Sequence, residues 1–281
     1  ARTPDTKNGA QTGFYPGGEY IFQKHFTAPQ AWQGKPVSLV FEGVYQTALV
    51  YLNGWLLTRN VNGYAEFTVE AGPYLKYGAD NLLKVIADNS LEPNSRWYTG
   101  SGIYRPVRLL VGNKVYLPQD TVRITTREAD EGFALLDVTA QVQSASTVTE
   151  RVTLQQTICR EGTAVLTDRQ NLLLQPGESR TVSFRYCVDS PALWSPENPN
   201  LYTSTMQVLE GEEELDREET RFGIRTLSID AAHGVRINGQ TVKLRGACIH
   251  HDNGILGAAT LPDAEERRIR QLKKAGFNAI R

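Results

Sequence analysis

The chain has 281 residues, of which 40% are hydrophobic, 30 are lysine or arginine and 31 are aspartate or glutamate. This length suffices for two or three domains, and a net charge of -1 provides no field that would draw the protein onto nucleic acid or an anionic membrane. No apolar run reaches the roughly 18 residues of a membrane-spanning helix. We therefore expect neither a nucleic acid nor a membrane as a partner.

Residues 1–117 have the pattern of a first β-sandwich. Short alternating apolar runs are divided by Gly, Pro, Asn and Asp, which predicts strands and turns with almost no helix. Asn53-Gly54 lies between two apolar runs and is the strongest hairpin signal, because a type I′ turn needs positive φ at both central positions. Turn residues after position 111 predict a domain boundary near Leu117.

Residues 118–225 form a second series of strands, about 100 residues long with few helix signals. This length and pattern favour an immunoglobulin-like sandwich. Met206 is the sole methionine, so we expect that a chain starting at Ala1 has lost its initiator, with or without a leader or an upstream strand.

Residues 226–281 change to a different pattern. A hairpin is predicted over 235–244, followed by a loop and then by a helix that Asp263 and Glu266 would cap and Gly276 would end. The apolar run 277–280 then predicts a strand. The segment therefore indicates a strand, helix, strand unit, which cannot bury both faces of its sheet alone.

Three cysteines, Cys159, Cys187 and Cys248, form an odd set without CxxC spacing. Neither a zinc site nor a disulfide framework is indicated, and we expect no metal. Cys187 should lie on the face of its strand opposite Phe184 and Tyr186. Free thiols are the simpler interpretation, and a bridge between Cys187 and Cys159 is the alternative.

The stretch WYTGSGIYR at 97–105 resembles the signature of glycoside hydrolase family 2. Supporting matches in the two sandwiches are VYLNG at 50–54, LWSP at 193–196, PNLY at 199–202 and FGIR at 222–225. Two more resemble the first and second strands of the family's barrel: LRGACIHHD at 244–252 and GFNAIR at 276–281.

The resemblance implies a mainly β chain with three parts. A jelly-roll sugar-binding β-sandwich (1–117) would precede an immunoglobulin-like β-sandwich (118–225) and the incomplete start of a TIM (β/α)8 barrel (226–281). By this resemblance the chain is the N-terminal portion of a retaining exo-β-glycosidase, most like a β-galactosidase, with β-glucuronidase or β-mannosidase specificity as alternatives. Its partner would be a carbohydrate substrate, without a cofactor. The compartment is open, and a periplasmic or extracellular one is expected only by analogy.

No catalytic residue is expected within this chain. Retaining glycosidases use two carboxylates about 5 Å apart, and the family carries them as glutamates on later barrel strands. The carboxylates after position 225 are Asp230, Asp252, Asp263, Glu265 and Glu266, and the last three lie at the predicted helix start. We therefore predict that this polypeptide alone does not hydrolyse glycosides, although the enzyme it resembles does.

The residues expected to bind substrate or support the active site are Arg281, His250, Asp88 and Asp252. By resemblance, Arg281 keeps the nucleophilic carboxylate ionised, and His250 contacts sugar hydroxyls. Asp88 would bind a hydroxyl where the family sends a loop toward the sugar site. The alternatives are a solvated arginine, a structural or metal-binding histidine and a turn-forming aspartate. Cys248, Ile249 and His251 depart from the family pattern, which leaves the sugar open.

Two other classes of protein fit parts of the pattern. A non-catalytic carbohydrate-binding or adhesion protein would need tandem sandwiches only, and the unit from 242 to 281 argues against it. A scaffold that associates through this unit is the third hypothesis, and it would form a homo-oligomer.

Overall fold

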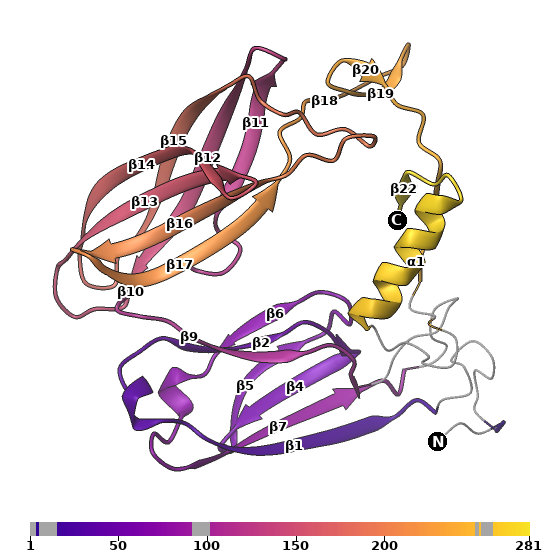
Figure 1. Ribbon diagram of the computed structural model, residues 1–281. Coiled ribbons are helices and arrows are strands. Elements are labelled where there is room, and N and C mark those ends of the chain that lie inside the picture. Colours follow the sequence, from indigo (N-terminus) through magenta and orange to yellow (C-terminus); the bar gives the residue numbers. More distant parts are fainter. Residues whose placement is uncertain (1–3, 6–15, 92–101, 251–252, 254–260) are drawn as a thin grey trace. The chain divides into compact units, whose positions relative to one another are not determined.

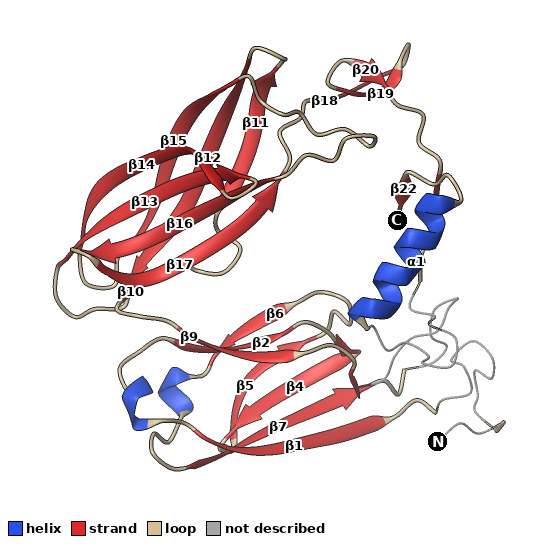
Figure 2. Ribbon diagram, in the orientation of Figure 1, coloured by secondary structure: helices blue, strands red, loops and turns tan. Residues whose placement is uncertain are grey.

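The computed structural model describes residues 4–5, 16–91, 102–250, 253 and 261–281. The chain divides into two compact units, Ala1–Val111 with Arg245–Arg281 and Gly112–Leu244. Strands dominate the described residues, as Figure 2 shows, and the described part contains a single α-helix, α1 (Pro262–Lys274). The mainly β class is confirmed. With 13 residues, α1 is too short to cross a bilayer, and no other helix in the described ranges could do so.

The first unit contains an antiparallel β-sandwich (Figure 1). One sheet has the order β1-β7-β4-β5 and the other the order β6-β2-β9, while β3 pairs with β8. Side chains from both sheets, such as Phe41, Val50 and Val85, form one core. The elements are β1 (Glu19–Thr27), η2 (Gln30–Trp32), β2 (Val37–Phe41), β3 (Val44–Tyr45), β4 (Thr47–Leu52), β5 (Trp55–Asn60), β6 (Phe67–Glu70), η3 (Gly72–Tyr74), β7 (Asp80–Asp88), β8 (Gly102–Ile103) and β9 (Val107–Val111).

The hairpin between β4 and β5 turns at Asn53 and Gly54, as predicted. Their φ angles are 52° and 91°, and Leu52 pairs with Trp55 across the turn. Asparagine and glycine tolerate positive φ, so the two-residue turn forms without the strain that a larger side chain would meet there. The turn residues therefore fix the register of β4 against β5.

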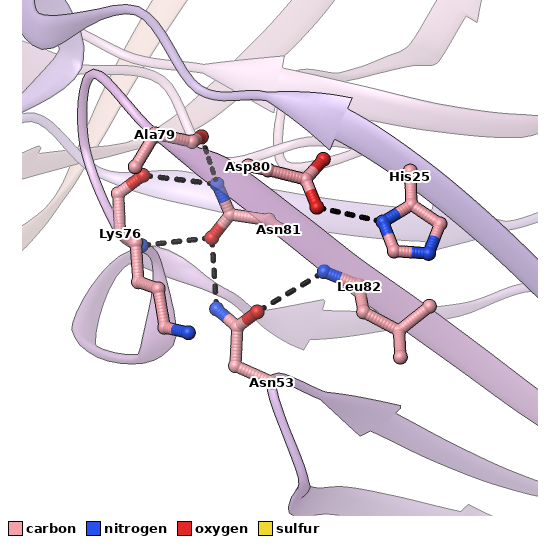
Figure 3. A network of polar contacts seen from close by, with 7 residues as sticks. All are labelled: His25, Asn53, Lys76, Ala79, Asp80, Asn81 and Leu82. Carbon is pink, nitrogen blue, oxygen red and sulfur yellow. Dashed lines mark hydrogen bonds and ion pairs between the residues drawn. The ribbon is translucent and has the colours of Figure 1, made fainter.

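A buried amide network holds this turn (Figure 3). Asn81 is fully buried; its Oδ1 accepts from Asn53 Nδ2 and Lys76 N, and its Nδ2 donates to the carbonyls of Lys76 and Ala79, all within 2.8–2.9 Å. Asn53 Oδ1 accepts from the Leu82 amide at 3.0 Å. Because every polar atom of the Asn81 side chain is paired, its burial costs little.

The second unit contains another antiparallel sandwich. One sheet has the order β10-β12-β11 with β15 also paired to β12, and the other has the order β14-β13-β16-β17. Residues of both sheets, including Leu136, Ile158 and Met206, share a core that also takes in Val115 and Leu117. The strands are β10 (Val115–Tyr116), β11 (Arg123–Ala129), β12 (Phe133–Ser144), β13 (Glu150–Arg160), β14 (Thr163–Leu174), β15 (Ser179–Asp189), β16 (Tyr202–Glu210) and β17 (Glu213–Phe222).

The cysteines are free, so the alternative of a bridge between Cys159 and Cys187 is wrong in this structure. Cys187 is exposed while Phe184 and Tyr186 of the same strand are buried, which confirms the predicted faces. Cys159 belongs to β13, in the sheet that does not contain the β15 strand of Cys187. Because their strands belong to different sheets, the two cysteines are not neighbours in one sheet.

Trp194 anchors the end of the second sandwich. Its amide donates to the Ile224 carbonyl at 2.8 Å, and its carbonyl accepts from Asn238 Nδ2 at 3.0 Å. The Arg225 guanidinium lies 4.3 Å from the centre of the Trp194 ring. A Cβ at Gly223 would come within 2.8 Å of Trp194, so only glycine allows this approach. The motifs at 193–196 and 222–225 therefore serve one packing contact.

A small sheet, β18-β19-β20, follows with strands β18 (Leu227–Asp230), β19 (Gly234–Ile237) and β20 (Gln240–Thr241). The hairpin expected over 235–244 is present, but its second strand is Gln240–Thr241 and residues 242–244 lie outside it. Asn238 and Gly239, with φ of 51° and 76°, form a two-residue turn. Such a turn pairs Ile237 directly with Gln240, which places the strand earlier than its apolar residues suggested.

The C-terminal segment is a strand, helix, strand unit: β21 (Gly246–Ala247), α1 and β22 (Ala279–Ile280). The two strands pair in parallel, as expected. The predicted cap by Asp263 is wrong: the N-cap is Leu261, without a side-chain cap. Pro262 takes the first helical position, because its ring presets φ and it has no amide to satisfy. Asp263 and Glu265 then lie in the first turn, where carboxylates offset the helix dipole.

Gly276 ends α1, as predicted. Its φ is 88°, its amide donates to the Lys273 carbonyl at 3.0 Å, and the Phe277 amide donates to the Leu272 carbonyl at 3.1 Å. These two bonds form a Schellman motif, which pairs carbonyls that the helix leaves unsatisfied. The chain thereby reverses toward β22.

Candidate functional site

The parallel strands β21 and β22 bring His250 and Arg281 to one edge. The Arg281 amide donates to the Ala247 carbonyl at 3.1 Å, and the Ile249 amide donates to the Arg281 carbonyl at 2.7 Å. Because parallel strands end on the same side of a sheet, the residues that follow them are neighbours. The structure therefore pairs the backbone of Arg281 with Ile249, the residue directly before His250.

The beginning of this strand pair is fixed by Arg245 and Asn278. The Arg245 amide donates to Asn278 Oδ1 at 2.7 Å, the Asn278 amide donates to the Arg245 carbonyl at 3.0 Å, and Arg245 Nε donates to the Gly276 carbonyl at 3.0 Å. A Cβ on Gly246 would lie 3.0 Å from the Ala279 carbonyl oxygen. Glycine thus permits the close approach that aligns the strand ends.

The Arg281 side chain is exposed, and its Nη1 lies 3.5 Å from Cys248 Sγ. A thiol is a weak acceptor and engages one of the five guanidinium donors. Within the described part of the chain, no carboxylate pairs with Arg281. The other N–H groups of its guanidinium suit a bidentate pair with a carboxylate.

His250 is half-buried, and the loop after it is held by α1. Arg268 donates to the His250 carbonyl at 3.5 Å and to Asn253 Oδ1. Asn253 Nδ2 donates to Glu265 Oε1 at 2.9 Å, and Glu265 lies 3.5 Å from Arg268. The sequence pattern did not predict this hydrogen-bonded cluster of Arg268, Glu265 and Asn253. The spacing of opposite charges three residues apart on a helix was the available signal.

Asp88 ends β7 and forms a turn. Its Oδ1 accepts from the Ser90 amide at 2.9 Å, and hydrogen bonds from the Ser90 side chain and amide hold the pKa of this carboxyl below its usual range. Glu19 and Thr47 are its neighbours on the adjoining strands. The turn-forming interpretation thus describes its local contacts.

Asp252 and residues 97–101 of the signature motif lie outside the described residues. The end of the motif is described: Gly102 has a φ of 81° and a Cβ there would lie 2.6 Å from the Phe22 ring. The Tyr104 hydroxyl donates to the Gly63 carbonyl at 2.8 Å, and the Arg105 guanidinium lies 5.4 Å from the Tyr104 ring. These contacts connect the motif to the core of the first sandwich.

Three of the described carboxylates after position 225, those of Asp230, Glu265 and Glu266, have local partners. Asp230 accepts from the amides of Ala232 and His233 and pairs with Arg236 at 2.7 Å. The hydrogen bonds from His233 are the largest cause of its lowered pKa. Glu266 pairs with Arg270 at 2.5 Å one turn along α1. The described residues also contain no group of three ligands that could hold a metal ion.

Two antiparallel sandwiches followed by a parallel strand, helix, strand unit define a multidomain protein with β modules ahead of an α/β segment. Two family models match in this order. The galactose-binding domain-like model of glycosyl hydrolase family 2 matches residues 5–134, and the model of glycosyl hydrolases family 2 matches residues 115–225. The chain belongs to glycoside hydrolase family 2, of which it carries sugar-binding and immunoglobulin-like domains.

Relatives in this family match over nearly the whole chain. The beta-galactosidase BoGH2A of Bacteroides ovatus is 37% identical over 278 residues, which are 99% of this chain and 33% of that protein. A putative beta-glucuronidase of Formosa agariphila is 33% identical, over 97% of this chain and 26% of its own length. The chain thus spans between about a quarter and a third of the length of these curated relatives.

Solved structures agree in fold. A glycosyl hydrolase family 2 member from Bacteroides cellulosilyticus has a TM-score of 0.92 at 35% identity, over 99% of this chain and 36% of that one. A Bacteroides uniformis beta-glucuronidase has a TM-score of 0.89 at 28% identity, over 99% of this chain and 35% of its own.

Proposed function

We propose that the chain is the N-terminal part of a retaining exo-β-glycosidase, most like a β-galactosidase. In this proposal the first sandwich, residues 1–117, is a jelly-roll sugar-binding domain, and residues 118–225 are the immunoglobulin-like domain. Residues 226–281 then begin a TIM (β/α)8 barrel. The observation that carries the proposal is the parallel pairing of β21 with β22 across α1, the repeating unit of such barrels.

The names of the relatives support a glycosidase that acts on β-linked sugars. Both beta-galactosidases and beta-glucuronidases match along the chain. Their active residues would lie on strands beyond this chain, because retaining hydrolysis needs two carboxylates about 5 Å apart. The local pairing of Asp230, Glu265 and Glu266 supports this proposal.

Three residues would serve the reaction from this chain. Arg281, at the carboxyl end of β22, would hold the nucleophilic carboxylate ionised and oriented, since a guanidinium stabilises the charged form. His250 would share a donor and an acceptor with sugar hydroxyls. Asp88 would accept a hydrogen bond from a sugar hydroxyl.

The test is hydrolysis of aryl β-galactosides, β-glucuronides and β-mannosides by the natural protein that contains this sequence. Arg281→Ala should lower kcat at least about a hundredfold with unchanged thermal unfolding, because the nucleophile loses its charge partner. Arg270→Ala, an exposed arginine of α1, is the matched control. Full activity of Arg281→Ala, or turnover by the 281-residue chain alone, would contradict the proposal.

A non-catalytic carbohydrate-binding protein remains the competing hypothesis. This hypothesis predicts that the natural protein binds saccharides but hydrolyses none of the aryl glycosides of the panel. The same assay therefore separates the two.

A further inference from the structure

Trp55 and Tyr74 form an exposed aromatic pair at one end of the first sandwich. Trp55 is 66% exposed and Tyr74 is 37% exposed, and their ring centres lie 6.4 Å apart with the planes tilted by 48°. Single exposed apolar side chains are common, but an exposed tryptophan beside an exposed tyrosine makes a larger flat apolar surface. Such a surface indicates a binding function.

The amide network connects the backbone segments that carry the pair. Asn53 Nδ2 donates to the Tyr74 carbonyl at 2.8 Å, and the same side chain is fixed by the fully buried Asn81. Trp55 starts β5 two residues after Asn53, directly across the turn from buried Leu52. The backbones that carry the two rings are therefore joined by one asparagine, and a ligand would bind without having to order them.

The chemistry of the pair fits a saccharide. An aromatic ring has a negative face and little capacity for hydrogen bonding, and a pyranose ring offers a face of C–H bonds with its hydroxyls around the rim. The near-zero net charge gives no attraction for a polyanion. The pair also lies within residues 5–134, which match a galactose-binding domain-like model.

We propose that Trp55 and Tyr74 form a surface platform on which one or two pyranose rings of a β-linked oligosaccharide stack. The tilt between the aromatic planes lets each ring meet a different sugar residue of the same chain. Galactose presents one continuous C–H face and glucose presents two, so both sugar types can stack.

This platform is separate from the end of the sheet that carries Asp88. Thr47 pairs with Asp88 and Leu52 with Leu83, so the hairpin turn lies at the opposite end of β4 (Figure 1). Six residues of strand correspond to about 20 Å. The platform would therefore hold a saccharide independently of the proposed active site and does not require that site to exist.

The experiment titrates the 281-residue chain with lactose and with cellotetraose. Tryptophan fluorescence and saturation-transfer NMR report binding, at sugar concentrations up to about 10 mM because a stacking site is expected to bind with a Kd near 1 mM. Trp55→Ala should weaken binding about tenfold and Tyr74→Ala about threefold, while Trp55→Phe retains part of the affinity. Leu56→Ala is the matched control, since Leu56 is 52% exposed beside Trp55 but has no aromatic face.

Three results would overturn the platform. One is the absence of saturable binding of either sugar by the wild-type chain. Another is equal affinity of the wild type and of a folded Trp55→Ala variant, which would place the sugar elsewhere. The third is a wild-type dimer in light scattering that Trp55→Ala dissociates, because the pair would then be a contact between copies. Loss of hydrolysis in the natural protein would not bear on any of them.

Discussion

Asn53 and Asn81 meet through a hydrogen bond of 2.8 Å that joins the β4–β5 turn to the start of β7. The two residues are 28 positions apart; Asn53 also accepts from the Leu82 amide, and Asn81 bonds to backbone groups of Lys76 and Ala79 (Figure 3). This amide pair connects the position of the aromatic platform to the core of the first sandwich.

Asn81→Ala should destabilise the first sandwich by about 1–3 kcal/mol, because it removes the hydrogen bonds that a fully buried side chain makes to Asn53, Lys76 and Ala79. Urea unfolding followed by circular dichroism measures the change. Asp80→Ala is the control: Asp80 pairs with His25 at 2.7 Å, but both are exposed, so the cost should stay below about 1 kcal/mol. Equal effects of the two variants would contradict the network's role.

Arg268→Ala should loosen the backbone at His250. The variant removes the donor to the His250 carbonyl and to Asn253, so amide hydrogen exchange over residues 247–250 should accelerate about tenfold or more. Arg268→Lys should restore only part of the protection, since a lysine cannot reach both acceptors with a planar fork. Arg270→Ala is the control: it removes the same charge two residues further along α1 and should leave the exchange unchanged.

Gly246→Ala should separate the parallel strands. A Cβ would lie 3.0 Å from the Ala279 carbonyl oxygen, which belongs to the backbone and cannot rotate away. We expect a loss of about 1–3 kcal/mol, as overpacked sites show, and faster exchange of the Ile249 and Arg281 amides. Gly132→Ala is a suitable control, because its Cβ would meet only an aspartate side-chain atom at 3.3 Å. A harmless Gly246→Ala would show that this strand pair tolerates a wider spacing.

Glu218 should make the second sandwich less stable as the pH rises. Burial, with the nearby negative charges of Asp120 and Asp216, raises the pKa of Glu218 from 4.5 to about 7. The folded state therefore binds more protons than the unfolded state between these values, and stability falls from about pH 4.5 to pH 7 and then levels off. Because the side chain is only half-buried, the fall should be about 1–2 kcal/mol.

Glu218→Gln tests this relation, since it removes the charge and should flatten the pH dependence of the denaturation midpoint. Asp120→Asn keeps the φ of 59°, which asparagine tolerates, and should shift the transition to lower pH by removing one repelling charge. A Glu218→Gln profile identical to the wild type would refute the assignment.

Local patterns predicted the elements that depend on neighbouring residues. Alternation of apolar residues indicated the strands, Asn53-Gly54 indicated the hairpin, and Gly276 indicated the end of α1. Each of these features is set by backbone conformations available to two or three residues. The cap of α1 was wrong because Pro262, one position before Asp263, has a stronger preference for the first helical turn.

The candidate site was only partly predictable. Motif spacing placed His250 and Arg281 after two strands. The helix spacing of Glu265 and Arg268 indicated their pairing, but their contact with Asn253 depends on how α1 packs. The exposed pairing of Trp55 with Tyr74 was equally hidden, because their separation of 19 positions is closed by the bonds of Asn53 and Asn81.

The sequence by itself determined the class of the protein: a mainly β chain of two sandwiches with a strand, helix, strand unit, identified by motifs of glycoside hydrolase family 2. Periodicity and turn chemistry are local, so they can be read along the chain. The tertiary structure alone decided which buried amides pair, which aromatic rings stay exposed and which helix residue holds the loop after His250. These contacts join residues far apart in the chain, and their formation depends on the packing of whole sheets.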